Sequence, residues 1–75
     1  MLNEYPVKKD DRILRMPEVM ETVGLSRPQI YLLISQGEFP SQIKLTPGGK
    51  VAGWLRSEVM DYIQSRVTVT RGLAA

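Results

Sequence analysis

The sequence contains neither cysteine nor histidine among its 75 residues. Disulfides, thiol nucleophiles, imidazole bases and the usual zinc ligand sets are therefore excluded. Carboxylates do occur in pairs, but Glu58 and Asp61 stand three positions apart on a predicted solvent-facing helix, where they suit solubility and capping better than acid–base catalysis. We predict that the protein is not an enzyme and uses no cofactor and no metal.

Long apolar runs are also missing. No segment approaches the ~20 apolar residues that span a bilayer, and the N-terminus lacks the basic start and apolar block of a signal peptide. A chain of 75 residues supports one domain, whose single core stabilises it by about 3 to 5 kcal/mol. We therefore predict one cytoplasmic domain with no membrane partner.

Aromatic residues are few, with one Trp, one Phe and three Tyr. Trp54, Phe39 and Ile30 stand among apolar neighbours, so we assign them to the core rather than to stacking on single-stranded bases. Trp54 is the largest apolar side chain available to close so small a core.

The formal net charge is only +2, but the charges are unevenly placed. Neither end of the chain is basic, since acidic residues match or outnumber cations in residues 1–11 and 57–75. Between these ends, three glutamates oppose six cations, namely Arg12, Arg15, Arg27, Lys44, Lys50 and Arg56. This basic surplus is what a nucleic-acid partner requires, although an ordinary solvated surface is the alternative.

Two short amphipathic helices are predicted around a tight turn, at residues 17–23 and 27–36. Gly24 stands where a left-handed residue ends the first helix. Ser26, followed three positions later by Gln29, forms a capping box that begins the second helix. Each helix is too short to persist alone and must bury its apolar stripe against the other and a third element. This pattern is typical of a helix-turn-helix.

A β-hairpin is predicted next along the chain. Residues 43–45 and 51–55 are β-prone and flank residues 46–50, whose proline and paired glycines favour a turn. Gly53 in the returning strand indicates a bulge or a close approach of another backbone. The hairpin is a candidate wing.

The remaining segments are a short strand, a third helix and the two ends. Residues 12–16 predict a short strand or an extended lead-in before the first helix, and Ser57 is the predicted N-cap of a third helix that ends near Arg66. Residues 1–11 lack apolar periodicity and are predicted to be a flexible arm. Residues 67–75 fit either a fraying tail or a strand offered to another chain. The predicted class is α+β, in the order β-α-α-β-β-α.

Four ordered blocks carry a family resemblance. They are Arg12-Ile13-Leu14-Arg15 with Pro17-Glu18-Val19, Gly24-Leu25-Ser26-Arg27 with Ile30-Tyr31, Gly37-Glu38-Phe39-Pro40, and Gly53-Trp54-Leu55 with Ser57-Glu58-Val59. With these blocks the chain resembles the AlpA family of small phage and prophage regulators, which are similar to phage excisionases and to the winged-helix part of MerR-type regulators. The resemblance covers residues 12–66, our predicted domain. It implies a small winged helix-turn-helix, with the second helix in the major groove and the hairpin against the backbone or minor groove.

Two features depart from the family pattern. Leu32 follows the Ile30-Tyr31 pair, where relatives often carry Arg or Lys, so one basic contact is missing. The turn at residues 46–50 offers Lys50 as its single cation. The resemblance therefore implies a site sequence different from those of relatives and a weaker wing contact.

The start of the second helix carries candidate DNA contacts. Ser26 can bind a phosphate oxygen at the helix N-terminus, with capping alone as the alternative. Arg27 is placed to pair with guanine O6 and N7. Gln29 can bind adenine, with its part in the capping box as the alternative. Tyr31, one turn after Arg27, suits a phosphate or a thymine methyl, with a half-buried ring as the alternative.

The other candidate contacts are cations that flank the core elements. We predict that they bind backbone phosphates, which changes affinity and salt dependence but not sequence preference. A solvated surface role is the alternative for each of them. They are Arg12, Arg15, Lys44, Lys50 and Arg56.

We predict sequence-specific binding to double-stranded DNA, and the resemblance implies a transcriptional regulator of a mobile element, for example of integrase expression. It equally allows an excisionase-type recombination directionality factor that bends attachment-site DNA. An alternative of another class is an interaction module that inhibits a protein partner, which Leu32 and the mild charge favour. Because one small module buries only ~600 to 1,000 Å² on DNA, we expect several copies to self-associate there.

Overall fold

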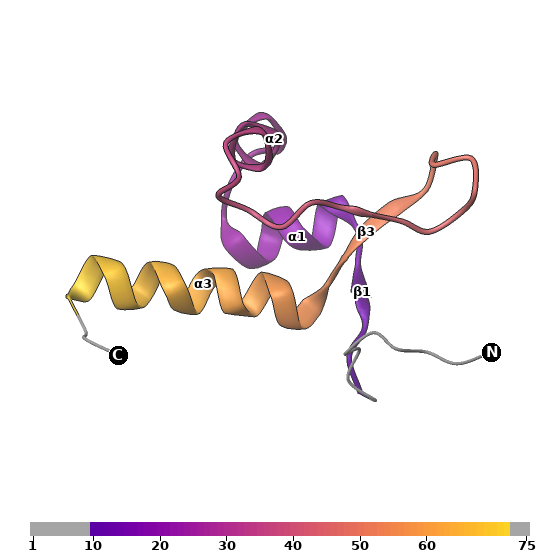
Figure 1. Ribbon diagram of the computed structural model, residues 1–75. Helices are drawn as coiled ribbons and strands as arrows, with labels where there is room; N and C mark the ends of the chain where they lie inside the picture. The colour runs from indigo at the N-terminus through magenta and orange to yellow at the C-terminus, as the bar shows by residue number, and fades with distance from the viewer. Residues whose placement is uncertain (1–9, 73–75) are drawn as a thin grey trace.

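The computed structural model describes residues 10–72 (Figure 1). The elements are β1 (Ile13–Leu14), α1 (Met16–Val23), α2 (Arg27–Ser35), β2 (Ile43–Lys44), β3 (Ala52–Leu55) and α3 (Arg56–Arg71). The predicted class and the order β-α-α-β-β-α are confirmed. Most of the predicted N-terminal arm, residues 1–9, lies outside the described residues.

The three strands form one small antiparallel sheet in the order β1-β3-β2. Leu14 pairs with Trp54, and Ile43 pairs with Gly53. A Cβ atom on Gly53 would lie only 2.8 Å from the carbonyl oxygen of Leu14 and would also overlap the side chain of Ile13. The predicted close backbone approach at Gly53 is therefore confirmed, and it lets β3 pair with strands on both sides.

A single core joins the sheet to the helices. It consists of Leu14, Met16, Val19, Ile30, Phe39, Trp54 and Val59. The indole N–H of Trp54 donates to the carbonyl oxygen of Pro40 at 2.9 Å, so its one polar atom is satisfied. The rings of Phe39 and Tyr62 pack in a T-shaped arrangement with their centroids 4.7 Å apart. The core assignment of Ile30, Phe39 and Trp54 is confirmed.

The turn between α1 and α2 is built by the predicted local signals. Gly24 has a φ of 74° and its N–H donates to the Met20 carbonyl at 2.8 Å, which ends α1. The Ser26 N–H donates to Gln29 Oε1 at 3.0 Å, and the Gln29 N–H donates to Ser26 Oγ at 3.4 Å. This reciprocal capping box fixes where α2 begins.

The prediction that Ser57 is the N-cap of the third helix is wrong. Since β3 runs directly into α3, Leu55 holds the cap position and Ser57 lies inside the first turn. The carboxylate of Asp11 instead accepts from the Ser57 N–H at 3.1 Å and from its hydroxyl at 2.6 Å. Asp11, which is distant in sequence, thus caps α3, and these bonds hold Asp11 on the domain rather than in the predicted flexible arm.

The third helix is also longer than predicted. It continues past Arg66 to Arg71 and ends at Gly72, whose φ is 67°. Neither a fraying tail nor a strand describes residues 67–71, while residues 73–75 lie outside the described part of the chain. The β-branched residues at 67–70 each disfavour a helix by only a few tenths of a kcal/mol, and no glycine or proline interrupts it before Gly72. The C-terminal half of α3 extends past α1 (Figure 1).

Candidate nucleic-acid interface

A concave surface lies where the starts of α1 and α2 meet the β2–β3 hairpin. Its polar lining consists of Arg15, Arg27, Lys50 and Tyr31. Its apolar lining consists of Met16, Pro17, Ala52 and Trp54. We call this surface the basic concavity. None of its lining residues is acidic, so the concavity has a positive charge.

Local structure positions each polar group of the basic concavity. Arg15 is the N-cap of α1, where Glu18 Oε1 accepts its backbone N–H at 3.1 Å. Arg27 is the first residue of α2, and Tyr31 follows one turn later on the same side of the helix. Lys50 is held near them by the hairpin, which the bond from the Leu45 N–H to the Val51 carbonyl closes at 2.7 Å.

The cations of the basic concavity have no ionic partner within residues 10–72. The one ion pair found there joins Arg12 to Glu18 at 3.5 Å, with both side chains well exposed. Such a pair contributes little to stability, but it places a carboxylate beside Arg12. Within the described residues no ion pair therefore engages Arg15, Arg27 or Lys50, and an anionic ligand would not have to displace a carboxylate from them.

Ser26 and Gln29 lie beside the basic concavity but do not line it. In addition to the capping bonds, the Ser26 hydroxyl donates to Gln29 Oε1 at 3.1 Å. Both side chains are exposed, yet the oxygen of each already takes part in the cap of α2. Contact with a ligand would therefore compete with the bonds that start the helix.

The other predicted cations lie elsewhere. Arg56 lines a second hollow together with Asp10, Asp11 and Asp61, where it faces carboxylates. Lys44 is an exposed residue of β2 whose side chain lies close to Gly49 in the hairpin turn. The fold therefore brings Arg15, Arg27, Lys50 and Tyr31 together and leaves Arg12, Lys44 and Arg56 outside the group.

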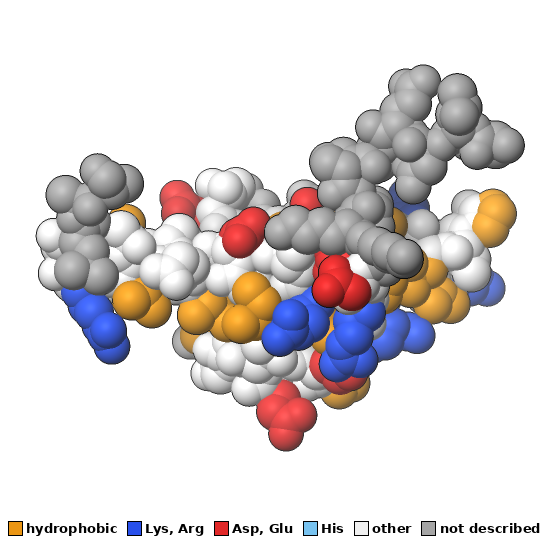
Figure 2. All heavy atoms as spheres, turned by 90° about the horizontal axis from the view of Figure 1, so that it is seen from below, with side chains coloured by type: hydrophobic (Ala, Val, Ile, Leu, Met, Phe, Trp, Pro, Cys, Tyr) orange, Lys and Arg blue, Asp and Glu red, His pale blue; other side chains and the backbone are white. Residues whose placement is uncertain are grey.

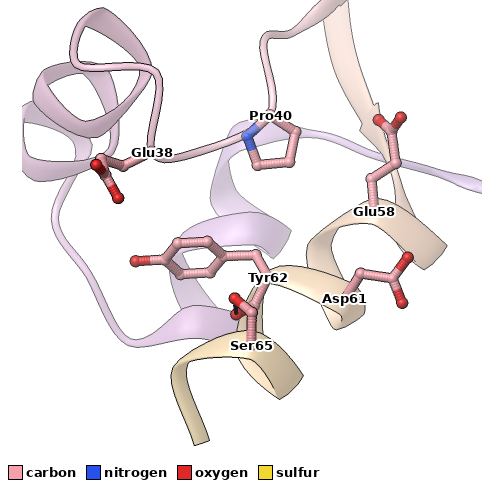
Figure 3. Close-up of a pocket in the computed structure, with 6 residues that line it drawn as sticks. All are labelled: Glu38, Pro40, Glu58, Asp61, Tyr62 and Ser65. Atoms are coloured by element: carbon pink, nitrogen blue, oxygen red, sulfur yellow. Dashed lines mark hydrogen bonds between the residues drawn. The ribbon is translucent and has the colours of Figure 1, made fainter. Parts of the chain in front are cut away.

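A further hollow, between α3 and the segment that follows α2, is acidic. It is lined by Glu38, Pro40, Glu58, Asp61, Tyr62 and Ser65, and Figure 3 shows the carboxylates arranged around the ring of Tyr62. Within residues 10–72 no three acidic side chains come close enough to hold a metal ion. This acidic hollow shares no residue with the basic concavity.

The surface of α3 also carries exposed apolar side chains. Figure 2 shows hydrophobic side chains along this helix between groups of cations. Met60 is 38% exposed and Val69 is 66% exposed. Among the described helices, none is long and apolar enough to cross a membrane.

The sequence profile of a known family, described as prophage CP4-57 regulatory protein (AlpA), matches residues 12–67. The chain belongs to the AlpA family. The match runs from β1 into the second half of α3 and includes every residue of the basic concavity. The resemblance inferred from four short blocks is thus confirmed, and the protein is a regulatory protein of the prophage type rather than an enzyme.

A phage protein is also similar to this AlpA-family chain. The uncharacterized protein ORF88 of Enterobacteria phage P4 is 53% identical over 66 residues, which cover 88% of this chain and 73% of ORF88. Both comparisons therefore connect the chain with phage and prophage sequences.

The sequence could not reveal the complete lining of the basic concavity. Met16, Pro17 and Ala52 carry no chemical signal of a binding surface, and Trp54 reads from the sequence only as a core residue. Their place at the site follows from the pairing of β3 with β1, which sets the start of α1 against the hairpin.

Proposed function

We propose that this AlpA-family protein binds double-stranded DNA at specific sites and thereby regulates transcription of a mobile element, for example of its integrase gene. The observation that carries the proposal is the basic concavity, in which three cations from separate elements surround the start of an exposed helix. In this proposal α2 enters the major groove, and the β2–β3 hairpin contacts the adjacent backbone.

The two faces of α2 suit this role. Ile30 is completely buried on the inner face, whereas Tyr31 and Leu32 are 43% and 56% exposed on the outer face. An α-helix fits the width of the major groove, and the first residues of a recognition helix commonly contact base edges. The outer face of α2 is therefore available to DNA without disturbing the core.

Roles along α2 follow from its hydrogen bonds. Arg27 has no ionic partner within residues 10–72, so its guanidinium can pair with guanine O6 and N7. Ser26 and Gln29 fix the start of the helix and thus the position of Arg27. Tyr31 lies beside Arg15 and Lys50 and can donate its hydroxyl to a phosphate.

A gel-shift assay tests the proposal. Fragments that carry the neighbouring promoters and attachment sites are bound at two salt concentrations by the wild type and by Arg27→Ala. Arg56→Ala is the matched control, because Arg56 faces carboxylates away from α2. We expect selective, salt-sensitive binding that Arg27→Ala weakens by about 1 to 3 kcal/mol at the preferred site and Arg56→Ala does not.

The site that is bound also decides between the two phage functions. A preferred promoter fragment supports a transcriptional regulator, whereas a preferred attachment-site fragment supports a recombination directionality factor. The absence of any selective binding contradicts both.

The exposed Leu32 in the middle of α2 favours a second candidate function, which is binding and inhibition of a protein partner. In that case affinity for duplex DNA is weak and insensitive to salt, because contacts through several cations always weaken as salt rises. A salt titration of DNA affinity therefore distinguishes this function from DNA recognition.

Several copies are expected to act together. One module of this size covers only ~600 to 1,000 Å² of its own surface on DNA, which limits specificity. Met60 and Val69 are exposed apolar side chains on α3, and because nine positions rotate an α-helix by about 180° beyond whole turns, they lie on opposite sides of α3, where each can contact a different neighbouring copy. Cooperative binding to adjacent sites is the expected consequence.

A further inference from the structure

We infer that the basic concavity is a seat for one backbone phosphate of DNA, held by Arg15 and Lys50 with the hydroxyl of Tyr31 beside them. We call these three residues the phosphate seat. The inference rests on the proposed DNA binding and adds to it a residue at the start of α1, outside the recognition helix and the hairpin.

The chemistry of the lining fits a single oxyanion. Arg15 offers a fork of N–H donors, Lys50 a compact charge and Tyr31 a neutral hydroxyl donor, and no carboxylate lines the concavity to compete with them. Both α1 and α2 also begin at this concavity, so the positive ends of two helix dipoles lie near it. Met16, Ala52 and Trp54 complete the lining with apolar groups that bind no anion.

The position of the concavity in the fold indicates which phosphate is bound. The concavity lies between α2 and the β2–β3 hairpin, because its lining comes from both. If α2 occupies the major groove and the hairpin reaches the next groove, the strand that separates the two grooves must pass between them. One phosphate of that strand then faces Arg15 and Lys50, while Arg27, which lines the same concavity from the start of α2, keeps the contact with the bases that the proposed function gives it.

The surroundings of Arg12 and Arg56 separate these two arginines from the phosphate seat. Arg12 is paired with Glu18 at 3.5 Å, and Arg56 shares its hollow with Asp10 and Asp61. A phosphate approaching either arginine meets nearby carboxylates, which repel it. Glu18 also accepts the backbone N–H of Arg15 at 3.1 Å, but Glu18 does not line the basic concavity, so an anion in the concavity meets Arg15 with no carboxylate in the lining.

The test measures how salt weakens binding of the full chain to a labelled duplex carrying the preferred site, or to a mixed-sequence duplex if no site is preferred. The proteins are the wild type, Arg15→Ala, Lys50→Ala, the double variant and the control Arg56→Ala. Arg15→Ala should fold, because the backbone N–H of Arg15, not its side chain, makes the cap bond to Glu18. Circular dichroism verifies that each variant is folded.

Because each neutralised phosphate contributes about 0.9 to the slope of log affinity against log salt, the double variant should lose about 0.9 in total. If Arg15 and Lys50 instead bound two separate phosphates, the slope of the double variant would fall by about twice that amount. The Arg56→Ala slope should equal that of the wild type. Sequence preference should survive in all of these variants, since a phosphate contact carries no sequence information.

A second experiment identifies the phosphate directly. Uncharged methylphosphonate replaces one phosphate at a time along the duplex. Substitution at one position should weaken the wild type and have no further effect on the double variant. Salt-sensitive binding without any such position, or a double variant with an unchanged slope, would overturn the seat and leave the DNA proposal intact. Binding that does not respond to salt at all would overturn both.

Discussion

Replacing Asp11 with alanine should destabilise the protein more than the half-buried position of Asp11 near the N-terminus suggests. Its carboxylate accepts the Ser57 N–H at 3.1 Å, the Ser57 hydroxyl at 2.6 Å and the Arg12 N–H at 2.9 Å. These bonds connect the chain before β1 to the first turn of α3, which has no side-chain cap of its own.

The expected loss follows from the kind of bond that is removed. Removal of an N-cap side chain costs about 0.5 to 2 kcal/mol, and a hydrogen bond to a charged group contributes about 1.5 to 3 kcal/mol. Because the bonds are only partly buried, we expect a loss of about 2 kcal/mol, near the upper end of the capping range. For a domain of this size the Tm should fall by about 8 to 16 °C.

Urea denaturation followed by circular dichroism measures this loss. Asp10→Ala is the matched control, because within the described residues Asp10 forms no hydrogen bond or ion pair. Asp11→Asn should lie between the two, since an amide oxygen can still accept the Ser57 N–H. If Asp11→Ala is as stable as Asp10→Ala within about 0.5 kcal/mol, the capping role is refuted.

Three further changes test the packing and the long third helix. Gly53→Ala should cost about 1 to 3 kcal/mol in urea denaturation, because its Cβ would overlap β1, whereas Gly48→Ala has open space and should behave as wild type. Ile30→Ala should cost about 2 to 5 kcal/mol, because this completely buried side chain joins α2 to the core; a smaller loss would contradict that packing. Deletion of residues 67–75 should reduce cooperativity on DNA with adjacent sites but leave single-site affinity unchanged, and identical binding curves would exclude residues 67–75 as the contact between copies.

Local signals in the sequence were sufficient to predict the helix-turn-helix formed by α1 and α2. Gly24 and the pair Ser26 and Gln29 act within a few residues of themselves, so their pattern alone located the turn and the start of α2. Gly53 likewise revealed a close approach, although not which strand makes it.

Contacts between residues that are distant in the chain could not be predicted from the sequence. Ser57 matched the pattern of an N-cap, but the acceptor that caps α3 belongs to Asp11, 46 residues away. The β-branched residues 67–70 indicated a strand or a tail, yet β-propensity depends on a neighbouring strand, and the helix simply continues to Gly72.

The candidate site shows the same division between local and distant information. Charge counting identified six cations in the middle of the chain but could not say which of them share a surface. Only the fold brings Arg15, Arg27 and Lys50 to one concavity and sets Arg56 among carboxylates.

Selective binding of the full chain to duplex DNA, compared between wild type and Arg27→Ala at two salt concentrations, tests the central claim most directly. The account predicts a preferred promoter or attachment-site fragment, weaker binding at higher salt, and loss of the preference in Arg27→Ala. Equal binding of all fragments by both proteins, or affinity that does not change with salt, would contradict DNA recognition by α2.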